Sequence, residues 1–336
     1  MAEKRFKVYV IHGRNPRDYS PCQAALAAVP ADLEPIPFTR HEEQIIARAR
    51  DADGLIVSSS PITRRVMSAL KNLRVIVRTG VGYDVIEVPA ATDLGIVVVN
   101  IPDLWIREVA NHALALLLAW NRQVPTLYAE VKRGVWQSRV PGPAGPLHGE
   151  TVGIVGFGNI GRAFARRAAA LETHVIAYDP YVDDAAFSAL GVERVGALEE
   201  LAARSDYVSV HCLLNAETRH LIDAAFLRRM KPTACLINTS RGPVVDEQAL
   251  IGALQQEWIA GAALDVQAHE PPAPDNPLAR MDNVILTPHA AYYSTAAVAQ
   301  VPQRCGEEVA RVLTGQRPLH VVNPEVYAVM MPPKAR

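Results

Sequence analysis

Three short segments in the second half of the chain carry side chains suited to chemistry on an organic acid. Arg241 lies in "INTSRGPVVDEQAL", Asp265 and Glu270 lie in "ALDVQAHEPP", and His289 lies in "LTPHAAYYS". A guanidinium can bind a carboxylate through two parallel hydrogen bonds. An imidazole moves protons near neutral pH, and a nearby carboxylate orients it. Each residue alone is explained equally well by an ordinary structural role. Together with a bound dinucleotide, however, these residues fit hydride transfer to a carbonyl beside a carboxylate.

A glycine-rich segment, "TVGIVGFGNIGRAFARR", supplies the dinucleotide signal. Gly156, Gly158 and Gly161 have the spacing G-x-G-x-x-G between a predicted strand and a predicted helix. The first glycine permits a tight turn, the second lets backbone approach a pyrophosphate, and the third lets the helix pack closely on the sheet. The free N–H groups of the helix N-terminus then face the phosphates. Asp179 follows 18 residues after Gly161, where its carboxylate would bind the ribose hydroxyls of NAD and repel the 2′-phosphate of NADP.

The substrate side of the site is predicted from loops in the first hundred residues. "SSSPIT" (58–63), "RTGVGYD" (78–84) and "PDLW" (102–105) should line a pocket, and they contain a single cation, Arg78. A phosphate dianion normally needs several cations or a helix N-terminus. We therefore expect a small unphosphorylated 2-oxo acid, such as glyoxylate or hydroxypyruvate, with Arg78, Val81 and Gly82 on one side and Tyr292 as a wall.

Composition and charge bound the class of protein. The chain has 336 residues, is 49% apolar and 21% charged, and has a formal net charge of -1. This balance leaves no basic surface for nucleic acid or an anionic membrane. The longest apolar run, "ALALLLAW", is too short to span a bilayer. Cys22, Cys212, Cys235 and Cys305 are scattered without paired spacing, so we expect neither a disulfide framework nor a metal site, and we expect a cytoplasmic protein.

The elements that must position these residues alternate between strands and helices. Continuous apolar runs at 6–11, 54–59, 73–79 and 95–100 predict buried parallel strands, and a second series follows at 151–156, 173–179, 207–212, 234–240, 261–266 and 283–289. Helical patterns fill the gaps, so we expect two α/β domains. The long apolar helix predicted at 107–123 is expected to be buried, either in its own core or, as we favour, between two subunits of a homodimer.

These motifs resemble the D-isomer-specific 2-hydroxyacid dehydrogenase family, in particular its phosphoglycerate dehydrogenase-like and C-terminal-binding-protein-like branch. The resemblance rests on "VGIVGFGNIGRAFARR", "LINTSRGPVVDEQALIGAL", "GAALDVQAHEPP" and "VILTPHAAYYS", and it runs from about residue 53 to about residue 320. It implies two doubly wound parallel-sheet domains, with a Rossmann NAD-binding domain inserted in a flavodoxin-like substrate domain. The implied boundaries are 105–290 for the first domain, and 1–104 with 291–336 for the second.

The resemblance also implies roles for single residues. Arg241 would bind the substrate carboxylate and carbonyl, His289 would be the acid and base, and Glu270 would hold its imidazole. Asp265 would contact the nicotinamide carboxamide. The full set of expected cofactor contacts comprises Gly156, Phe157, Gly158, Asn159, Ile160, Gly161, Asp179, Thr239 and Asp265.

Two other functions stay open from the sequence. One is a dinucleotide-sensing binding protein, as in the corepressor relatives, although the three catalytic positions are filled here. The other is oxidation of phosphite on the same scaffold. Formate oxidation is disfavoured, because formate enzymes of this superfamily have glutamine in the place of Glu270. We expect an NAD-dependent oxidoreductase that interconverts a small 2-oxo acid and its D-2-hydroxy acid.

Overall fold

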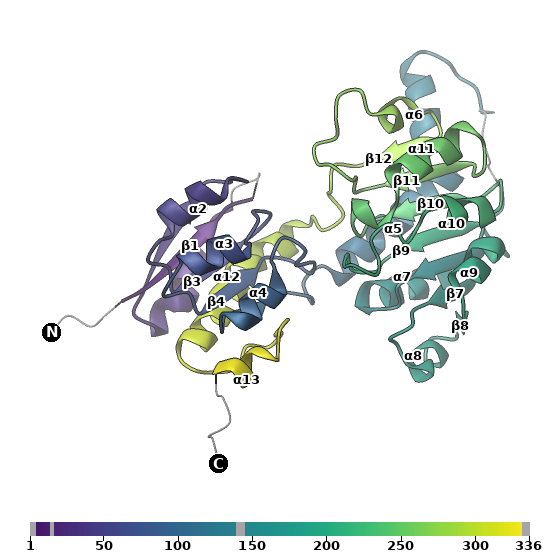
Figure 1. Ribbon diagram of the computed structural model, residues 1–336. Coiled ribbons are helices and arrows are strands. Elements are labelled where there is room, and N and C mark those ends of the chain that lie inside the picture. The colour runs from purple at the N-terminus through teal and green to yellow at the C-terminus, as the bar shows by residue number, and fades with distance from the viewer. Residues whose placement is uncertain (1–4, 14–16, 139–144, 331–336) are drawn as a thin grey trace. The chain divides into compact units, whose positions relative to one another are not determined.

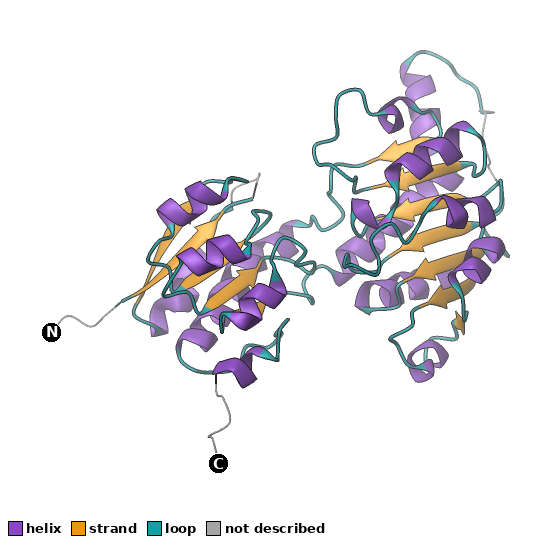
Figure 2. Cartoon of the chain, viewed as in Figure 1, coloured by secondary structure: helices purple, strands orange, loops and turns teal. Residues whose placement is uncertain are grey.

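The chain folds into two compact units in a computed structural model that describes residues 5–13, 17–138 and 145–330 (Figure 1). Unit 1 comprises Met1–Trp105 and Ser294–Arg336, and unit 2 comprises Ile106–Tyr293. In each unit, helices lie on both faces of a sheet (Figure 2). All strand pairs in both sheets are parallel.

Unit 1 contains a five-stranded sheet in the order β2-β1-β3-β4-β5. Its strands are β1 (Phe6–Ile11), β2 (Ala31–Ile36), β3 (Gly54–Val57), β4 (Val75–Arg78) and β5 (Val97–Val99). Its helices are α1 (Ser20–Ala25), the single turn η1 (Leu26–Ala28), α2 (Glu42–Arg48), α3 (Arg64–Ala69), α4 (Val88–Asp93), α12 (Thr295–Leu313) and α13 (Val326–Met330). This strand order is that of flavodoxin-like folds.

The C-terminal segment belongs to unit 1 because it packs into that sheet's layers. Helix α12 packs against α1 and β4, and Ser294 caps its first turn by accepting a hydrogen bond from the Ala297 N–H. Asn323 is buried, and its amide binds the Val98 N–H and the Ile96 carbonyl beside strand β5. These contacts join chain segments more than two hundred residues apart.

Unit 2 contains a seven-stranded sheet in the order β12-β11-β10-β9-β6-β7-β8. Its strands are β6 (Thr151–Val155), β7 (His174–Tyr178), β8 (Glu193–Arg194), β9 (Tyr207–Val210), β10 (Cys235–Asn238), β11 (Gly261–Leu264) and β12 (Val284–Leu286). Its helices are α5 (Ile106–Asn121), α6 (Val124–Lys132), α7 (Asn159–Ala169), α8 (Asp184–Ser188), α9 (Leu198–Arg204), α10 (Ala224–Arg229) and α11 (Glu247–Gln255), with the single turns η2 (Gly242–Val244) and η3 (Pro277–Arg280).

Both faces of the unit 2 sheet are buried, which explains why its strands are continuous apolar runs. Neighbouring residues of β10 point to opposite faces, since Leu236 belongs to one core cluster and Ile237 to the other. Helices α9, α10 and α11 cover the first face, and α5 and α7 cover the second. The strand order reverses between β6 and β9, and ligands of such sheets bind at that point, outside the carboxyl ends of the strands.

The predicted fold class, two doubly wound parallel sheets with a Rossmann-type unit inserted in a flavodoxin-like one, is confirmed. The apolar runs gave the central strands, but β2 was missed because Asp32, Glu34 and Pro35 interrupt its apolar pattern. Strand β2 lies at the edge of its sheet, where a proline is tolerated.

The 107–123 helix is buried mainly within its own unit. Leu116, Leu117 and Trp120 belong to the core of unit 2, where α5 packs against α7, β10 and β11. Leu114 and Leu118 pack against that core while partly exposed. The place of this helix in a dimer interface stays a prediction. The exposed apolar side chains lie one helix later. Helix α6 has no buried residue, and Val124, Tyr128, Val131 and Trp136 are all at least 48% exposed.

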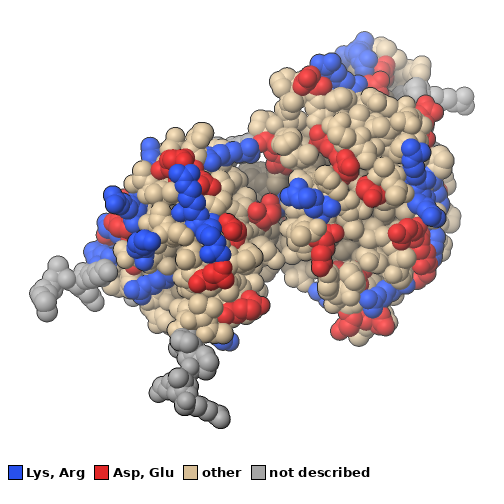
Figure 3. All heavy atoms as spheres, viewed as in Figure 1, with Lys and Arg blue, Asp and Glu red and all other residues tan. Residues whose placement is uncertain are grey.

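Surface charge is mixed. On the face shown in Figure 3, lysine and arginine side chains are interspersed with aspartate and glutamate on both units, in keeping with a formal net charge of -1. None of the helices in the described part of the chain is both long enough and apolar enough to cross a bilayer.

Candidate active site

The glycine-rich turn between β6 and α7 is fixed by steric contacts. Gly156 has a φ of 94°, and a Cβ atom there would lie 2.5 Å from the Cys212 backbone nitrogen. A Cβ atom at Gly161 would lie 2.2 Å from the Gly156 carbonyl oxygen. At Gly158, in contrast, a Cβ atom would meet nothing within 4 Å. Gly156 and Gly161 therefore close the turn, and Gly158 leaves open space over the start of α7.

Asp179, at the carboxyl end of β7, ties this turn to the neighbouring loop. Its carboxylate accepts hydrogen bonds from the Phe157 N–H at 2.8 Å and from the Tyr181 N–H at 2.9 Å. The Phe157 side chain is fully buried and stacks on Phe187 with ring centroids 4.4 Å apart, so Phe157 can meet a ligand only through its backbone. Asn159 begins α7 and accepts a hydrogen bond from Arg162 at 2.8 Å, and Ile160 is half-buried beside it.

The residues at the carboxyl ends of β6 and β10 fit a dinucleotide. The space over Gly158 adjoins the N-terminus of α7, an eleven-residue helix whose first N–H groups can face phosphates. At the end of β10, the buried Thr239 hydroxyl has no hydrogen-bond partner among the described residues. An unpaired buried hydroxyl is costly unless a ligand or water binds it. Thr239 follows β10 and the glycine turn follows β6, so both lie at the carboxyl ends of strands in the same sheet.

His289 and Glu270, which the sequence suggested as an acid–base pair, lie in direct contact. The His289 Nδ1 atom lies 2.8 Å from the Glu270 Oε2 atom, and both side chains are about one third exposed. Burial alone would raise the pKa of the Glu270 carboxyl, but the hydrogen bond and charge of His289, the Gln267 N–H and the charge of Arg241 hold that pKa below its ordinary value. The Tyr292 ring stands edge-on to the His289 ring, with centroids 6.3 Å apart.

Arg241 follows β10 and lies within electrostatic reach of Glu270. Its backbone N–H binds the Ser240 hydroxyl at 2.6 Å, and its carbonyl accepts from the Asn238 amide at 2.9 Å. The structure thus gathers Arg241, Glu270 and His289 at the carboxyl ends of β10, β11 and β12. Because the three strands are adjacent and parallel, residues separated in sequence meet at one edge.

The loop that carries His289 is held by a buried carboxylate. Asp265 has no exposed side-chain surface, and it accepts hydrogen bonds from the Thr287 hydroxyl at 2.5 Å, the Ala290 N–H at 2.8 Å and the Ala291 N–H at 2.9 Å. Burial would raise the pKa of Asp265, but these donors and His112 outweigh it and lower that pKa to about 2. His289 has a φ of 53°, a left-handed conformation that costs roughly 1–3 kcal/mol and persists only where surrounding contacts impose it.

Sequence reasoning missed His112, which faces the same carboxylate. Its Nε2 atom lies 3.0 Å from the Thr287 hydroxyl and 3.4 Å from Asp265. His112 stands on α5, 175 residues before Thr287, and nothing in a helical apolar pattern singles it out. Among the described residues, no group of three or more His, Cys, Asp or Glu side chains is arranged to hold a metal ion.

The predicted substrate residues of unit 1 lie at the carboxyl end of β4. Arg78 ends that strand and donates to the Thr79 hydroxyl at 3.2 Å, and the Val81 carbonyl accepts from Asn100 at 2.8 Å, while Gly82 is buried. Sequence reasoning missed a second cation here. Burial raises the pKa of Tyr19, and the charges of both Arg17 and Arg78 oppose that rise, so the two guanidinium groups share one neighbourhood.

Comparison with known proteins identifies the sequence family. The family model described as "D-isomer specific 2-hydroxyacid dehydrogenase, NAD binding domain" matches residues 114–291. A glyoxylate reductase of Korarchaeum cryptofilum is 41% identical over 292 residues, which cover 86% of this chain and 88% of the relative. A D-3-phosphoglycerate dehydrogenase of Methanocaldococcus jannaschii is 40% identical over 284 residues. The chain spans only about half the length of that relative, 54%.

A solved structure shares the fold of the whole chain. It is an NADPH-dependent glyoxylate/hydroxypyruvate reductase from Sinorhizobium meliloti, in complex with NADP and malonate. The match has a TM-score of 0.85 at 30% sequence identity, and it covers 96% of this chain and 98% of the other.

We predict that Asp265→Asn destabilises the protein in a pH-dependent way. A pKa lowered from 3.8 to about 2 corresponds to about 2 kcal/mol of stability. A depressed carboxyl pKa contributes its stability above the unfolded value, and this is lost as pH falls through the folded value. In urea unfolding, the gap between wild type and Asp265→Asn should be constant above about pH 5 and shrink by about 1 kcal/mol by about pH 3.

The exposed Asp282→Asn substitution is the control for removing one carboxylate from unit 2. A gap that stays the same from pH 7 to pH 3 would contradict a role for the Asp265 charge.

Proposed function

The chain belongs to the D-isomer-specific 2-hydroxyacid dehydrogenase family, and we propose that it is an NAD-dependent oxidoreductase that interconverts a small 2-oxo acid and the corresponding D-2-hydroxy acid. The observation that carries the proposal is the 2.8 Å contact between His289 and Glu270, with Arg241 beside them, at the carboxyl edge of the nucleotide-binding sheet. This combination supports catalysis over dinucleotide sensing, because binding alone does not require a paired imidazole and carboxylate.

The cofactor, when bound, supplies the hydride in reduction and accepts it in oxidation. The residues of the chain would do the rest. Glu270 engages the Nδ1 atom of His289, which leaves the Nε2 atom to give a proton to the substrate oxygen in reduction and to take it back in oxidation. The Glu270 charge stabilises the imidazolium form. Arg241 would bind the substrate carboxylate and orient the carbonyl.

Reduction assays test this proposal. NADH consumption should be measured with glyoxylate, hydroxypyruvate, pyruvate and phosphohydroxypyruvate. We infer an unphosphorylated substrate from the few cations in the substrate loops, and the glyoxylate reductase similarity supports it. Phosphohydroxypyruvate belongs in the panel because Arg17 adds a second cation near Arg78. Faster turnover of phosphohydroxypyruvate than of every other acid would contradict the substrate proposal, and no turnover at all, with tight NADH binding, would favour a sensor.

We predict that His289→Asn cuts turnover by ~10²–10⁴-fold, the usual contribution of a general acid. Asparagine tolerates the left-handed backbone at this position, so the change removes the imidazole without adding strain. NADH affinity, measured by fluorescence titration, should change by less than about twofold, since the glycine turn is untouched. The exposed His148→Asn is the control. Near-normal turnover by His289→Asn would remove this residue from the mechanism.

We predict a preference for NADH over NADPH that depends on Asp179. Asp179 binds the Phe157 and Tyr181 N–H groups beside the glycine turn, and its charge would repel the 2′-phosphate of a cofactor bound there. The reductase from Sinorhizobium meliloti, in contrast, is in complex with NADP. Asp179→Asn keeps an acceptor for the Phe157 N–H but removes the charge. The ratio of NADH to NADPH efficiency should fall by about 10-fold or more. Equal use of both cofactors by the wild type would refute the role of Asp179, and the exposed Glu199→Gln is the control.

We predict a homodimer whose interface includes the exposed surface of α6. Val124, Tyr128, Val131 and Trp136 form an exposed apolar surface on one short stretch, and such surfaces mark protein interfaces. Val131→Lys should weaken self-association in analytical ultracentrifugation by about 10-fold or more. Val329→Lys on α13 is a matched control, because both valines are 48% exposed. A monomeric wild type at micromolar concentration would contradict the dimer.

The proposed location is the cytoplasm. The four cysteines are free thiols in the structure, and reducing compartments keep thiols in this state.

A further inference from the structure

The loop that presents Glu270 runs over the surface of unit 2. It connects β11 to η3, and His269, Pro271, Ala273, Pro274 and Asp275 are exposed along it. Exposed loops with few buried contacts open easily. The position of the Glu270 carboxylate beside His289 therefore depends on how the two ends of this loop are attached.

Glu247 attaches both ends at once. It is the first residue of α11, and one carboxylate oxygen accepts a hydrogen bond from the Ala268 N–H at 3.0 Å, while the other accepts from the Asn276 side-chain amide at 3.1 Å. Ala268 precedes Glu270 by two residues, and the buried Asn276 follows it by six. Glu247 thus bridges the start and the end of the loop that carries Glu270.

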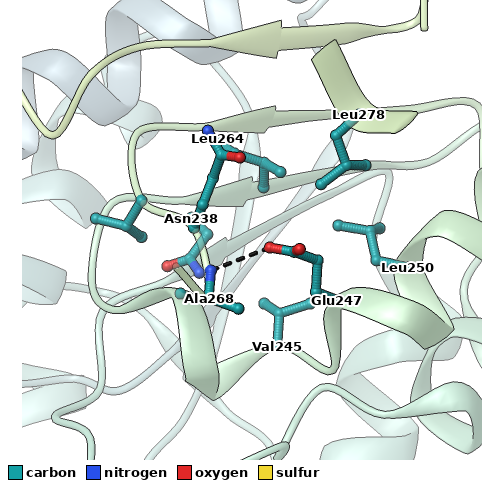
Figure 4. Close-up of a pocket in the computed structure, with 10 residues that line it drawn as sticks. Asn238, Val245, Glu247, Leu250, Leu264, Ala268 and Leu278 are labelled. Atoms are coloured by element: carbon teal, nitrogen blue, oxygen red, sulfur yellow. Dashed lines mark hydrogen bonds between the residues drawn. The ribbon is translucent and has the colours of Figure 1, made fainter. Parts of the chain in front are cut away.

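The surroundings of this bridge strengthen it. Figure 4 shows Glu247 directed toward Ala268 inside a pocket whose other walls include Val245, Leu250 and Leu278. These three side chains are at most 4% exposed. A hydrogen bond to a charged group is stronger beside apolar groups than in water, and losing one partner there is more costly.

A tight backbone contact fixes the same loop against the Arg241 segment. A Cβ atom at Gly242 would lie 2.0 Å from the Gln267 carbonyl carbon and 2.5 Å from the Ala268 nitrogen. Gly242 directly follows Arg241, and the Gln267 N–H lies 3.3 Å from the Glu270 carboxylate. The glycine contact sets how close the two segments come, and the Glu247 bridge holds the loop in that place.

We propose that Glu247 is a positioning residue, whose carboxylate bridge between Ala268 and Asn276 holds Glu270 in contact with His289. It acts through the loop. The catalytic readout of this inference rests on the proposed dehydrogenase function, whereas the geometric readout does not.

Exchanging the partners of the bridge tests it. In Glu247→Gln, the new amide oxygen can still accept from Ala268, but its NH₂ group faces the NH₂ group of Asn276. In Asn276→Asp, two carboxylates face each other, while the new side chain can still cap η3 at the Leu278 N–H, as Asn276 does. In the double variant, the new amide donates to the new carboxylate and accepts from Ala268, so both bonds return and only the bond between the two side chains has reversed polarity.

The first measurement is kcat and KM for 2-oxo acid reduction by each variant. Each single variant should lose ~10–100-fold in kcat, the usual effect of a misplacement of about 1 Å, while KM for the acid changes less than about threefold. The double variant should recover most of the loss. Glu199→Gln is the matched control, because Glu199 is an exposed first-turn glutamate of α9 and its loss changes the charge at a helix N-terminus equally. It should leave kcat unchanged.

A spectroscopic readout in the cofactor-free protein separates positioning from activity. The His289 Nδ1 proton donated to Glu270 should give a downfield proton NMR signal, assigned by its absence from His289→Asn. This signal should disappear or shift in both single variants and return in the double variant. Thermal unfolding should show that all three variants are folded. If the wild type reduces no 2-oxo acid but these shifts occur, the proposed function fails and the positioning role stands.

Two results would overturn the positioning role. One is a kcat and an NMR signal in both single variants like those of the wild type. The other is a double variant as impaired as the single variants, because the loss would then not come from the broken bridge.

Discussion

The site depends on one buried charge, the Asp265 carboxylate. A carboxylate without exposed surface must receive hydrogen bonds, and three of the donors to Asp265 follow β12: the Thr287 hydroxyl and the N–H groups of Ala290 and Ala291. Satisfying that charge therefore shapes the turn after β12, and His289 takes its left-handed backbone inside this turn. The hydrogen bonds that the Asp265 carboxylate requires therefore determine where the imidazole of His289 lies.

The same physical device recurs around the nucleotide-binding edge. Asp179 binds the Phe157 N–H of the glycine turn, and Glu247 binds the Ala268 N–H of the Glu270 loop. Loops at the end of a parallel sheet contain N–H groups that no strand pairs, and acidic side chains from neighbouring segments satisfy them. Glycines add the steric half of the arrangement, since Gly156, Gly161 and Gly242 each allow a backbone approach that a Cβ atom would prevent. Charge fixes where the loops attach, and glycine fixes how closely they pack.

Much of this arrangement was predictable from the sequence because it is local. The apolar runs of β6 and β10 predicted buried parallel strands, since both faces of the sheet are covered. The spacing of Gly156, Gly158 and Gly161 predicted the turn before α7, and Arg241, Glu270 and His289 were found from their residue types at predicted strand ends. Once adjacent parallel strands are assumed, topology alone brings such strand-end residues to one edge.

The tertiary structure decided what depends on distant partners. The α5 helix and the α6 helix are both apolar in sequence, and only the packing of Trp120 against Tyr207 and β11 shows that α5 is covered within its own unit while α6 is not. Three other contacts likewise join segments that are 21 to 175 residues apart. They are the hydrogen bonds of Asp265 to the loop that carries His289, the contact of His112 with Thr287, and the bridge made by Glu247. Sequence periodicity reports which face of an element is apolar. It does not report which neighbour covers that face or which donor a carboxylate meets, because both follow from how the elements pack.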